Sequence, residues 1–306
     1  MPSLVDAEAL ARLSTLHLRA RGLAKGLRLG LHRSRRLGTA VEFADWEVYR
    51  PGLDARRIDW RVWARTDRLL VRRSHEETDL PVLVVLDASA DLASGPQVPS
   101  PGRPDLAQGK AGAAIVLAAT LMVAAWDGGE PVGLELIAGK VERRRFPPRR
   151  GQNGLAMGLG SLASVVPAGR AGLGEQLVSV ASRAPHKAVV FLLTDGMEPL
   201  HDWLPALRGF AARGVDLRVL HLRDEAELRL DGVGVTWLVS PETGEERVVD
   251  ADVVRVGLRL ARDRHDSSVR DAVHALGGLW WAVDTGAPLP PVVARALLGR
   301  RDETWI

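Results

Sequence analysis

Residues 82–91 have the sequence VLVVLDASAD, in which an unbroken run of aliphatic, mostly β-branched residues stops at Asp87. A second apolar run, residues 188–193, also ends at a carboxylate, in the segment Thr194-Asp195-Gly196. Strands that are apolar at every residue, rather than at alternate residues, are typical of parallel sheets covered by helices on both faces. The two runs therefore predict central strands of an α/β domain.

The rest of the chain alternates between helical and extended patterns. Helices are predicted at residues 110–126, 203–213, 252–276 and 290–298, strands at 132–137, 215–222 and 279–283, and a hairpin at 235–249. This alternation predicts a doubly wound, mostly parallel sheet in an α/β domain spanning residues 78–306. Residues 1–77 have a helical pattern at 6–29 and short extended pieces such as 69–73, so we predict a preceding domain made of a helical arm and a small β-rich module.

The composition is that of a folded protein without cysteine. Of 306 residues, 46% are hydrophobic and 26% are charged, which excludes a disordered or fibrous chain. The absence of Cys excludes a disulfide framework and thiolate chemistry and is compatible with a reducing compartment. The N-terminal residues lack a signal-peptide pattern, and the longest apolar run, residues 111–126, is shorter than the ~20 residues that span a bilayer. We therefore expect a cytoplasmic protein with no transmembrane segment.

Oxygen-bearing side chains follow both central strands. Asp87, Ser89 and Asp91 alternate after the first run, and Asp195 follows the second. Because the carboxyl ends of parallel strands meet at one edge of a sheet, we expect these four side chains to converge there. An all-oxygen set suits a hard cation such as Mg²⁺, but Asp and Ser at strand ends also serve as helix caps. Both interpretations are open from these residues alone.

Basic residues are concentrated near the N-terminus. Between Arg19 and Arg36 there are seven basic residues and no acidic one. Such a stripe fits nucleic acid, acidic lipid or an acidic protein, and it also fits a solvated surface. Aromatic residues that would stack on bases are scarce in this stripe, so nucleic-acid binding is an alternative function and not the main one.

Motifs for other chemistry are incomplete. Gly109-Lys110 does not form a phosphate loop, because Ala111 stands where Ser or Thr is needed. The eight His residues show no paired metal-ligand spacing, and His265 is expected on an exposed helix face. A metal-dependent hydrolase acting through the three Asp residues above is a second alternative, but no general base or nucleophile stands out. We expect neither an enzyme nor a small-molecule substrate.

The N-terminal module resembles one family in detail. The segments that carry the resemblance are residues 30–38 (GLHRSRRLG), 42–45 (EFAD), 49–54 (YRPGLD), 57–60 (RIDW) and 64–69 (ARTDRL). They strongly resemble the bacterial domain-of-unknown-function family 58 (DUF58), and the likeness extends over residues 20–300. The resemblance implies a von Willebrand factor A-like domain and association with MoxR-type AAA+ ATPases, for which such proteins are thought to act as adaptors or assembly partners. It implies no enzymatic activity and leaves the client protein unidentified.

The resemblance also implies a metal-ion-dependent adhesion site, which binds Mg²⁺ through an Asp-x-Ser-x-Ser pattern, a loop Thr and a later Asp. Asp87 and Ser89 match the first two positions and Asp195 matches the last, whereas Asp91 replaces the second Ser. The loop Thr is missing, and residues 175–176 (Glu-Gln) stand in its place. We therefore expect a degenerate site with modest affinity for Mg²⁺ or another divalent cation. Without a metal, the three carboxylates would repel one another unless one is protonated or an Arg pairs with them.

The same module is predicted to carry the partner-binding surface. Arginines and acidic residues are densely mixed through residues 30–68, which fits an ion-pair network that docks the module onto the α/β domain. The module also fits a binding surface for another protein, because Trp and Arg dominate binding hot spots. The partner-binding residues that we predict are Arg33, Arg35, Arg36, Trp60 and Arg65.

Overall fold

The structure, a computed structural model, describes residues 20–21, 46–50, 60–72, 80–93, 109–137, 145–169, 172–224, 234–240, 243–285 and 289–298. The chain divides into two compact units, one formed by Leu31–Asp79 and the other by Met1–Gly30 with Leu80–Ile306. Of the helix predicted at 6–29, only residues 20–21 are described, and they are helical. The predicted domain boundary after residue 77 lies outside the described residues.

A six-stranded sheet forms the centre of the larger unit. Its strand order is β10-β7-β6-β3-β4-β5, and all strands pair in parallel except β5, which is antiparallel to β4. The strands are β3 (Val82–Asp87), β4 (Val132–Ile137), β5 (Arg145–Arg149), β6 (Val189–Thr194), β7 (Asp216–Arg223) and β10 (Leu279–Asp284). Every residue of β3, β4 and β6 is buried, as the unbroken apolar runs of β3 and β6 predict. The predicted mixed α/β class with a mostly parallel sheet is confirmed.

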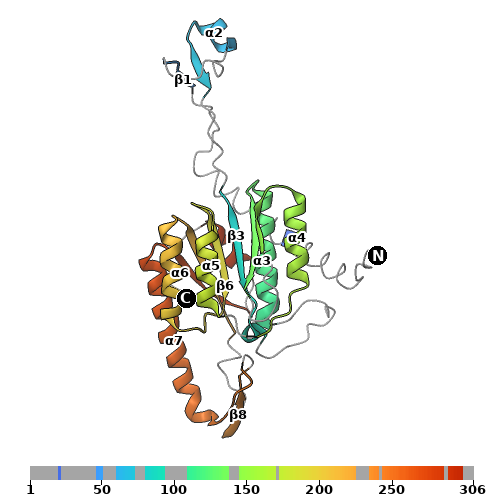
Figure 1. Cartoon of the computed structure of the whole chain (residues 1–306), viewed down its shortest axis with the longest axis vertical. Coiled ribbons are helices and arrows are strands. Elements are labelled where there is room, and N and C mark those ends of the chain that lie inside the picture. Colours follow the sequence, from blue (N-terminus) through green and yellow to red (C-terminus); the bar gives the residue numbers. More distant parts are fainter. Residues whose placement is uncertain are drawn as a thin grey trace, which may run out of the picture. The chain divides into compact units, whose positions relative to one another are not determined.

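Helices cover both faces of this sheet (Figure 1). One face packs against α3 (Gly109–Asp127), α4 (Gln152–Ala163) and α8 (Leu289–Leu298). The other face packs against α5 (Leu173–Arg183), α6 (Leu200–Ala212) and α7 (Ala251–Ala275). Successive residues of a strand point to opposite faces, so Val84 of β3 belongs to the first core and Val85 to the second.

α3 is apolar on nearly all sides because the fold encloses it. Among the described residues, it is the one helix long and apolar enough to cross a membrane, and 78% of its most hydropathic window is buried inside the unit. Its Thr120 hydroxyl donates to the carbonyl oxygen of Val116 (2.6 Å), so this polar group needs no solvent. A buried helix that is apolar all round is what the core of a doubly wound sheet requires.

Three elements of this unit, α4, α5 and β5, were not predicted from the sequence. α4 contains three glycines and α5 follows a Gly-rich segment, and glycine disfavours helices. β5 contains Pro147 and Pro148, which are tolerated there because it is the edge strand of the sheet. β5 lies so close to Gly133 of β4 that a Cβ at Gly133 would be 2.6 Å from the Phe146 carbonyl oxygen. These elements therefore depend on their position in the fold more than on local propensity.

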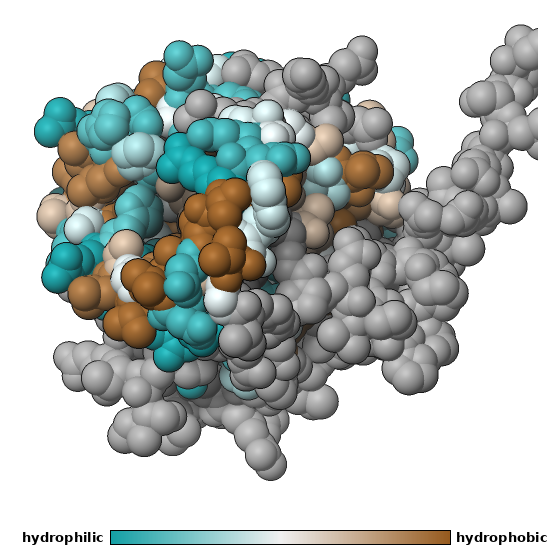
Figure 2. Space-filling view, turned by 90° about the horizontal axis from the view of Figure 1, so that it is seen from below, coloured by the Kyte–Doolittle hydropathy of each residue, from teal (hydrophilic) through white to brown (hydrophobic). Residues whose placement is uncertain are grey.

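The predicted hairpin is present and leads directly into α7. β8 (Val235–Val239) and β9 (Glu246–Asp250) pair antiparallel, and the Asp250 carboxylate caps α7 by accepting from the N–H of Asp252 (3.0 Å). The hairpin and the first half of α7 extend beyond the sheet in Figure 1. Their exposed apolar side chains are Val235, Trp237, Val239, Val248, Val253, Val256 and Leu260. Figure 2, which views the unit from this end, shows hydrophobic patches bordered by hydrophilic residues.

The smaller unit contains β1 (Trp46–Val48), α2 (Trp60–Thr66) and β2 (Leu70–Arg72) among its described residues. β1 and β2 pair antiparallel, and the N–H of Tyr49 extends the pairing by donating to the Leu69 carbonyl oxygen (2.8 Å). β2 falls within the extended piece predicted at 69–73, whereas the helix α2 was not expected from the sequence.

Candidate functional site

The predicted site lies at the carboxyl ends of β3 and β6, where the strand order of the sheet reverses. From β3 the chain adds β4 and β5 on one side and then returns to add β6, β7 and β10 on the other. In open α/β sheets, the crevice at such a reversal is where ligands bind. Asp87 ends β3 and Thr194 ends β6, so the topology brings the two polar segments together.

Asp87 is buried, and both of its carboxylate oxygens accept hydrogen bonds. Oδ1 accepts from the N–H of Ser89 (3.0 Å), and Oδ2 accepts from the hydroxyl of Thr194 (2.7 Å). Burial, followed by the negative charge of Asp195, raises the pKa of Asp87 to about 7, although these hydrogen bonds act in the opposite direction. Near neutral pH, Asp87 therefore carries a proton in a large share of the molecules.

The ammonium group of Lys110 meets the carboxylate of Asp195. Nζ lies 2.8 Å from Oδ2, and the two side chains are only 2% and 4% exposed. Lysine is almost never buried without a partner, so this pair ties the start of α3 to the end of β6. From the sequence, Lys110 was considered only as part of a phosphate loop, and no local pattern signals its pairing with a residue 85 positions away.

Asp91 lies on the short helix η2 (Ala90–Ala93) and is half-buried. Burial and the charge of Asp195 raise the pKa of Asp91, whereas Lys110 and Arg262 act to lower it. These effects mean that Asp91, Asp195, Lys110 and Arg262 interact as one group of charges at the edge of the sheet. The three carboxyl groups expected to converge are thus brought together, and two cations are near them.

Backbone hydrogen bonds hold the loop that follows β3. The N–H of Ala90 donates to the Gly169 carbonyl oxygen (2.9 Å), and the N–H of Ala168 donates to the Ala88 carbonyl oxygen (3.0 Å). These bonds join the loop to the segment that follows α4. They keep Ser89 buried between the end of β3 and η2.

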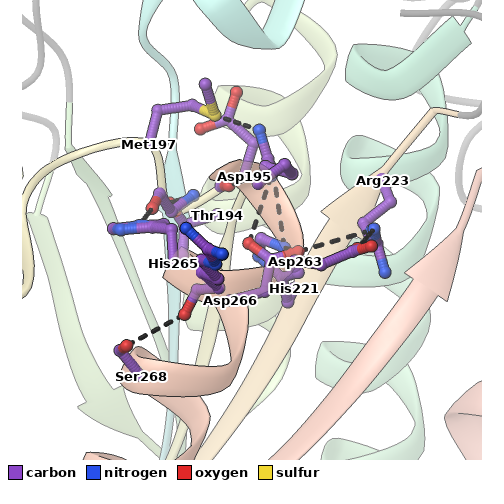
Figure 3. Close-up of polar contacts among 12 residues, drawn as sticks. Thr194, Asp195, Met197, His221, Arg223, Asp263, His265, Asp266 and Ser268 are labelled. Carbon is purple, nitrogen blue, oxygen red and sulfur yellow. Dashed lines mark hydrogen bonds and ion pairs between the residues drawn. The ribbon is translucent and has the colours of Figure 1, made fainter. Parts of the chain in front are cut away.

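α7 holds the loop that follows β6 (Figure 3). Nη2 of Arg262 donates to the carbonyl oxygen of Asp195 (2.7 Å), and Nη1 contacts the sulfur of Met197. Nε2 of His265 lies 2.7 Å from the carbonyl oxygen of Gly196 and must be the donor, because a carbonyl only accepts. The prediction that His265 lies on an exposed helix face is wrong, because α7 packs against this loop.

A buried histidine lies beneath the same loop. Nε2 of His221 is 3.1 Å from Oδ2 of Asp266, whose Oδ1 is 3.1 Å from Nε of Arg262. Burial lowers the pKa of His221, which favours a neutral ring that stacks on Trp280 with centroids 4.7 Å apart. Burial acts to raise the pKa of Asp266, but the hydrogen bond from His221 and the charges of Arg262 and Arg223 outweigh it, so this pKa is lowered. This contact joins β7, which carries His221, to α7, which carries Asp266, beneath the loop.

The region expected to replace the missing loop Thr is the start of α5. Glu175 is exposed there. The helix is tied to the site by Glu198, whose Oε1 accepts from the N–H of Leu173 (2.8 Å) and whose Oε2 accepts from the N–H of Gly174 (3.1 Å). A carboxylate at a helix N-terminus satisfies free N–H groups and the positive end of the helix dipole. Glu198 therefore fixes α5 against the loop that carries Asp195.

These residues do not present the ligand arrangement of a divalent-cation site. In the part of the chain that the structure describes, no group of three or more His, Cys, Asp or Glu side chains is placed to hold a metal ion. Both oxygens of Asp87 accept hydrogen bonds from the protein, and one oxygen of Asp195 is engaged by a buried ammonium. Mg²⁺ needs several oxygens that point at it in octahedral geometry. With Lys110 on Asp195, the arrangement therefore does not fit the ion that the resemblance implies.

The predicted partner-binding residues are partly described. Outside the described residues lie Arg33, Arg35 and Arg36. Trp60 and Arg65 are exposed on α2 of the smaller unit, with Trp60 58% exposed. Trp63, which is 42% exposed, packs edge to face against Trp60 with ring centroids 6.0 Å apart. α2 thus presents two indole rings and a guanidinium on one short helix.

Comparison with known proteins identifies the family. The family model described as "Protein of unknown function DUF58" matches residues 45–270, and the chain therefore belongs to the DUF58 family. Uncharacterised proteins from Mycobacterium bovis and Mycobacterium tuberculosis are each 27% identical to it over 300 residues, which cover 97% of this chain and 91% of the relative.

Two solved structures also match. The conserved hypothetical protein BatB from Bacteroides thetaiotaomicron is 15% identical with a TM-score of 0.44, and the match covers 72% of this chain and 98% of BatB. An aerotolerance-related membrane protein from Bacteroides fragilis is 16% identical with a TM-score of 0.42, and the match covers 72% of this chain and 100% of that protein.

Proposed function

We propose that the protein is a non-enzymatic interaction protein, an adaptor that works with a MoxR-type AAA+ ATPase on a client protein. The ATPase is proposed from the resemblance stated above. We also propose that the larger unit is of the von Willebrand factor A type, which is supported by the Asp-x-Ser segment after β3 and the Asp after β6 of a mostly parallel sheet. A cytoplasmic location is part of the proposal, and the absence of Cys is compatible with it.

The exposed Trp60–Trp63 pair on α2 is the observation that carries the interaction role. Trp is highly buried on average in folded proteins, and together with Arg it is the residue type most enriched at binding hot spots. The two rings already pack against each other, so they lose little conformational freedom when a partner covers them. Arg65 on the same helix adds a cation for a partner's carboxylate.

The two alternative functions have weaker support. Nucleic-acid binding would use the stripe between Arg19 and Arg36, of which only residues 20–21 are described. A metal-dependent hydrolase would act through the clustered carboxyl groups, but Lys110 is paired with Asp195 and the oxygens of Asp87 are hydrogen-bonded within the protein.

Binding of the purified protein to the MoxR-type ATPase of the same cell, with and without nucleotide, tests the proposal. Trp60→Ala and Trp63→Ala should each raise the Kd by about 10-fold or more, which corresponds to about 1.4 kcal/mol. Trp237→Ala is the matched control, because Trp237 is exposed to a similar degree (66%) on the β8–β9 hairpin of the other unit.

All three replaced side chains are exposed, so the Tm should stay within about a degree of the wild-type value. The control variant should bind the ATPase as the wild type does. An equal loss of binding in all three variants, or no binding by the wild type, would contradict the proposal.

A further inference from the structure

We infer that the ammonium of Lys110 takes the place of the divalent cation at this sheet edge, so that the acidic cluster is neutralised from within the chain and needs no metal. The inference rests on the Lys110–Asp195 pair and its surroundings. It does not depend on the proposed ATPase, so either can fail while the other stands.

A lysine at position 110 is unfavourable unless its ammonium pairs with the carboxylates. It lies in the first turn of α3, which has no acidic residue, and the positive end of the helix dipole disfavours a cation there. Its side chain is also withdrawn from water. The compensating interactions are the 2.8 Å contact with Asp195 and the attraction to Asp91. The carboxylates are therefore the physical reason for a lysine at this position.

The carboxylates of Asp91 and Asp195 already have two cations beside them. Asp91 and Asp195 face Lys110 and Arg262, and Arg262 also donates to the backbone carbonyl oxygen of Asp195 (2.7 Å). A divalent cation would add two positive charges beside a buried ammonium. It could reach Asp195 Oδ2 only by displacing Lys110. Repulsion at such short range in a buried site is strong, so the pair opposes metal binding.

Two departures from the adhesion-site pattern compensate each other. That pattern has a neutral hydroxyl where this chain has Asp91, which adds one negative charge. Lys110 adds one positive charge at the same edge. The extra carboxylate of Asp91 is thus balanced by a cation from within the chain. A partner that docks at this edge would therefore contact a preformed ion pair, and its binding would not depend on divalent cations.

The test is a titration of MgCl₂, MnCl₂ and CaCl₂ into the chelator-treated full-length protein, followed by its Tm. The wild-type Tm should not change at millimolar metal. In Lys110→Met, which keeps an apolar stem but removes the charge, the Tm should rise by several degrees in proportion to the logarithm of the metal concentration. Adding Asp195→Asn to this variant should remove the rise. Lys187→Met, at an exposed lysine, is the matched control and should behave as the wild type.

A wild-type Tm that rises with metal and no longer does so in Asp195→Asn would overturn the inference. A folded Lys110→Met variant whose Tm does not change with any of the three metals would overturn the inference as well. If Lys110→Met does not fold, Mn²⁺ binding to the wild type, measured by electron paramagnetic resonance, decides the question. Stoichiometric bound Mn²⁺ at this edge overturns the inference, and no bound Mn²⁺ supports it.

Discussion

Gly174→Ala is expected to destabilise the larger unit, although alanine is the better helix former. α5 approaches α6 so closely at Gly174 that a Cβ there would lie 2.5 Å from the carbonyl oxygen of Asp202, whereas ordinary contacts begin at 3.4 Å. The two helices must therefore separate locally by about 1 Å. Overpacking of this kind costs about 1–3 kcal/mol, which exceeds the ~1 kcal/mol that alanine gains over glycine within a helix.

Gly160→Ala is the matched control for this prediction. Gly160 lies within α4, and a Cβ there meets nothing within 4 Å, so the variant should be more stable than the wild type by up to ~1 kcal/mol. In urea unfolding followed by circular dichroism, the two variants should differ by about 1–3 kcal/mol with unchanged m values. If Gly174→Ala unfolds at the wild-type urea concentration, the close packing of α5 on α6 would be refuted.

Three further predictions concern the sheet, the loop and the buried histidine. Val84→Asp places an unpaired charge in the central strand and should lower the free energy of unfolding by about 3–5 kcal/mol; an unchanged Tm would contradict the position of β3. Glu198→Ala removes two acceptors from the start of α5 and should lower this free energy by about 1–3 kcal/mol, with Glu198→Gln intermediate, also by urea unfolding. Because burial lowers the pKa of His221, only the unfolded chain gains its proton just below pH 6.5, so the wild type loses stability as the pH falls. His221→Gln should therefore lose less stability than the wild type as the pH falls below about 6.5, measured by urea unfolding, and a constant difference would show that His221 titrates as in the unfolded chain.

The centre of the fold could be predicted because its strands are apolar at every residue. β3 and β6 must be buried on both faces wherever they lie, so their sequence alone indicates a covered parallel sheet. α4 and β5 could not be predicted this way. Three glycines and two prolines oppose their local structures, which form because neighbouring elements bury their apolar side chains, as Leu159 and Phe146 show.

The candidate site could be predicted in its acidic part only. The Asp residues that follow β3 and β6 converge because parallel strands end at one edge, a rule that needs no side-chain detail. Their repulsion was expected to be relieved by protonation, a metal or an Arg. The structure has the raised pKa of Asp87, an Arg (Arg262) whose charge lowers the pKa of Asp91, and in addition a buried Lys, Lys110, paired with Asp195. The contact of Lys110 with Asp195 depends on how α3 starts relative to β6, which no local pattern encodes.

The two prolines of β5 also affect how the protein can associate with itself. An edge strand with free N–H and C=O groups is a template on which a strand of another chain can add, and such addition leads to aggregation. Pro147 and Pro148 have no N–H to offer, and Arg145 and Arg149 place exposed charge along the same strand. This edge is therefore protected against growth of a continuous intermolecular sheet, even though the strands behind it have the apolar, β-branched composition typical of aggregating segments.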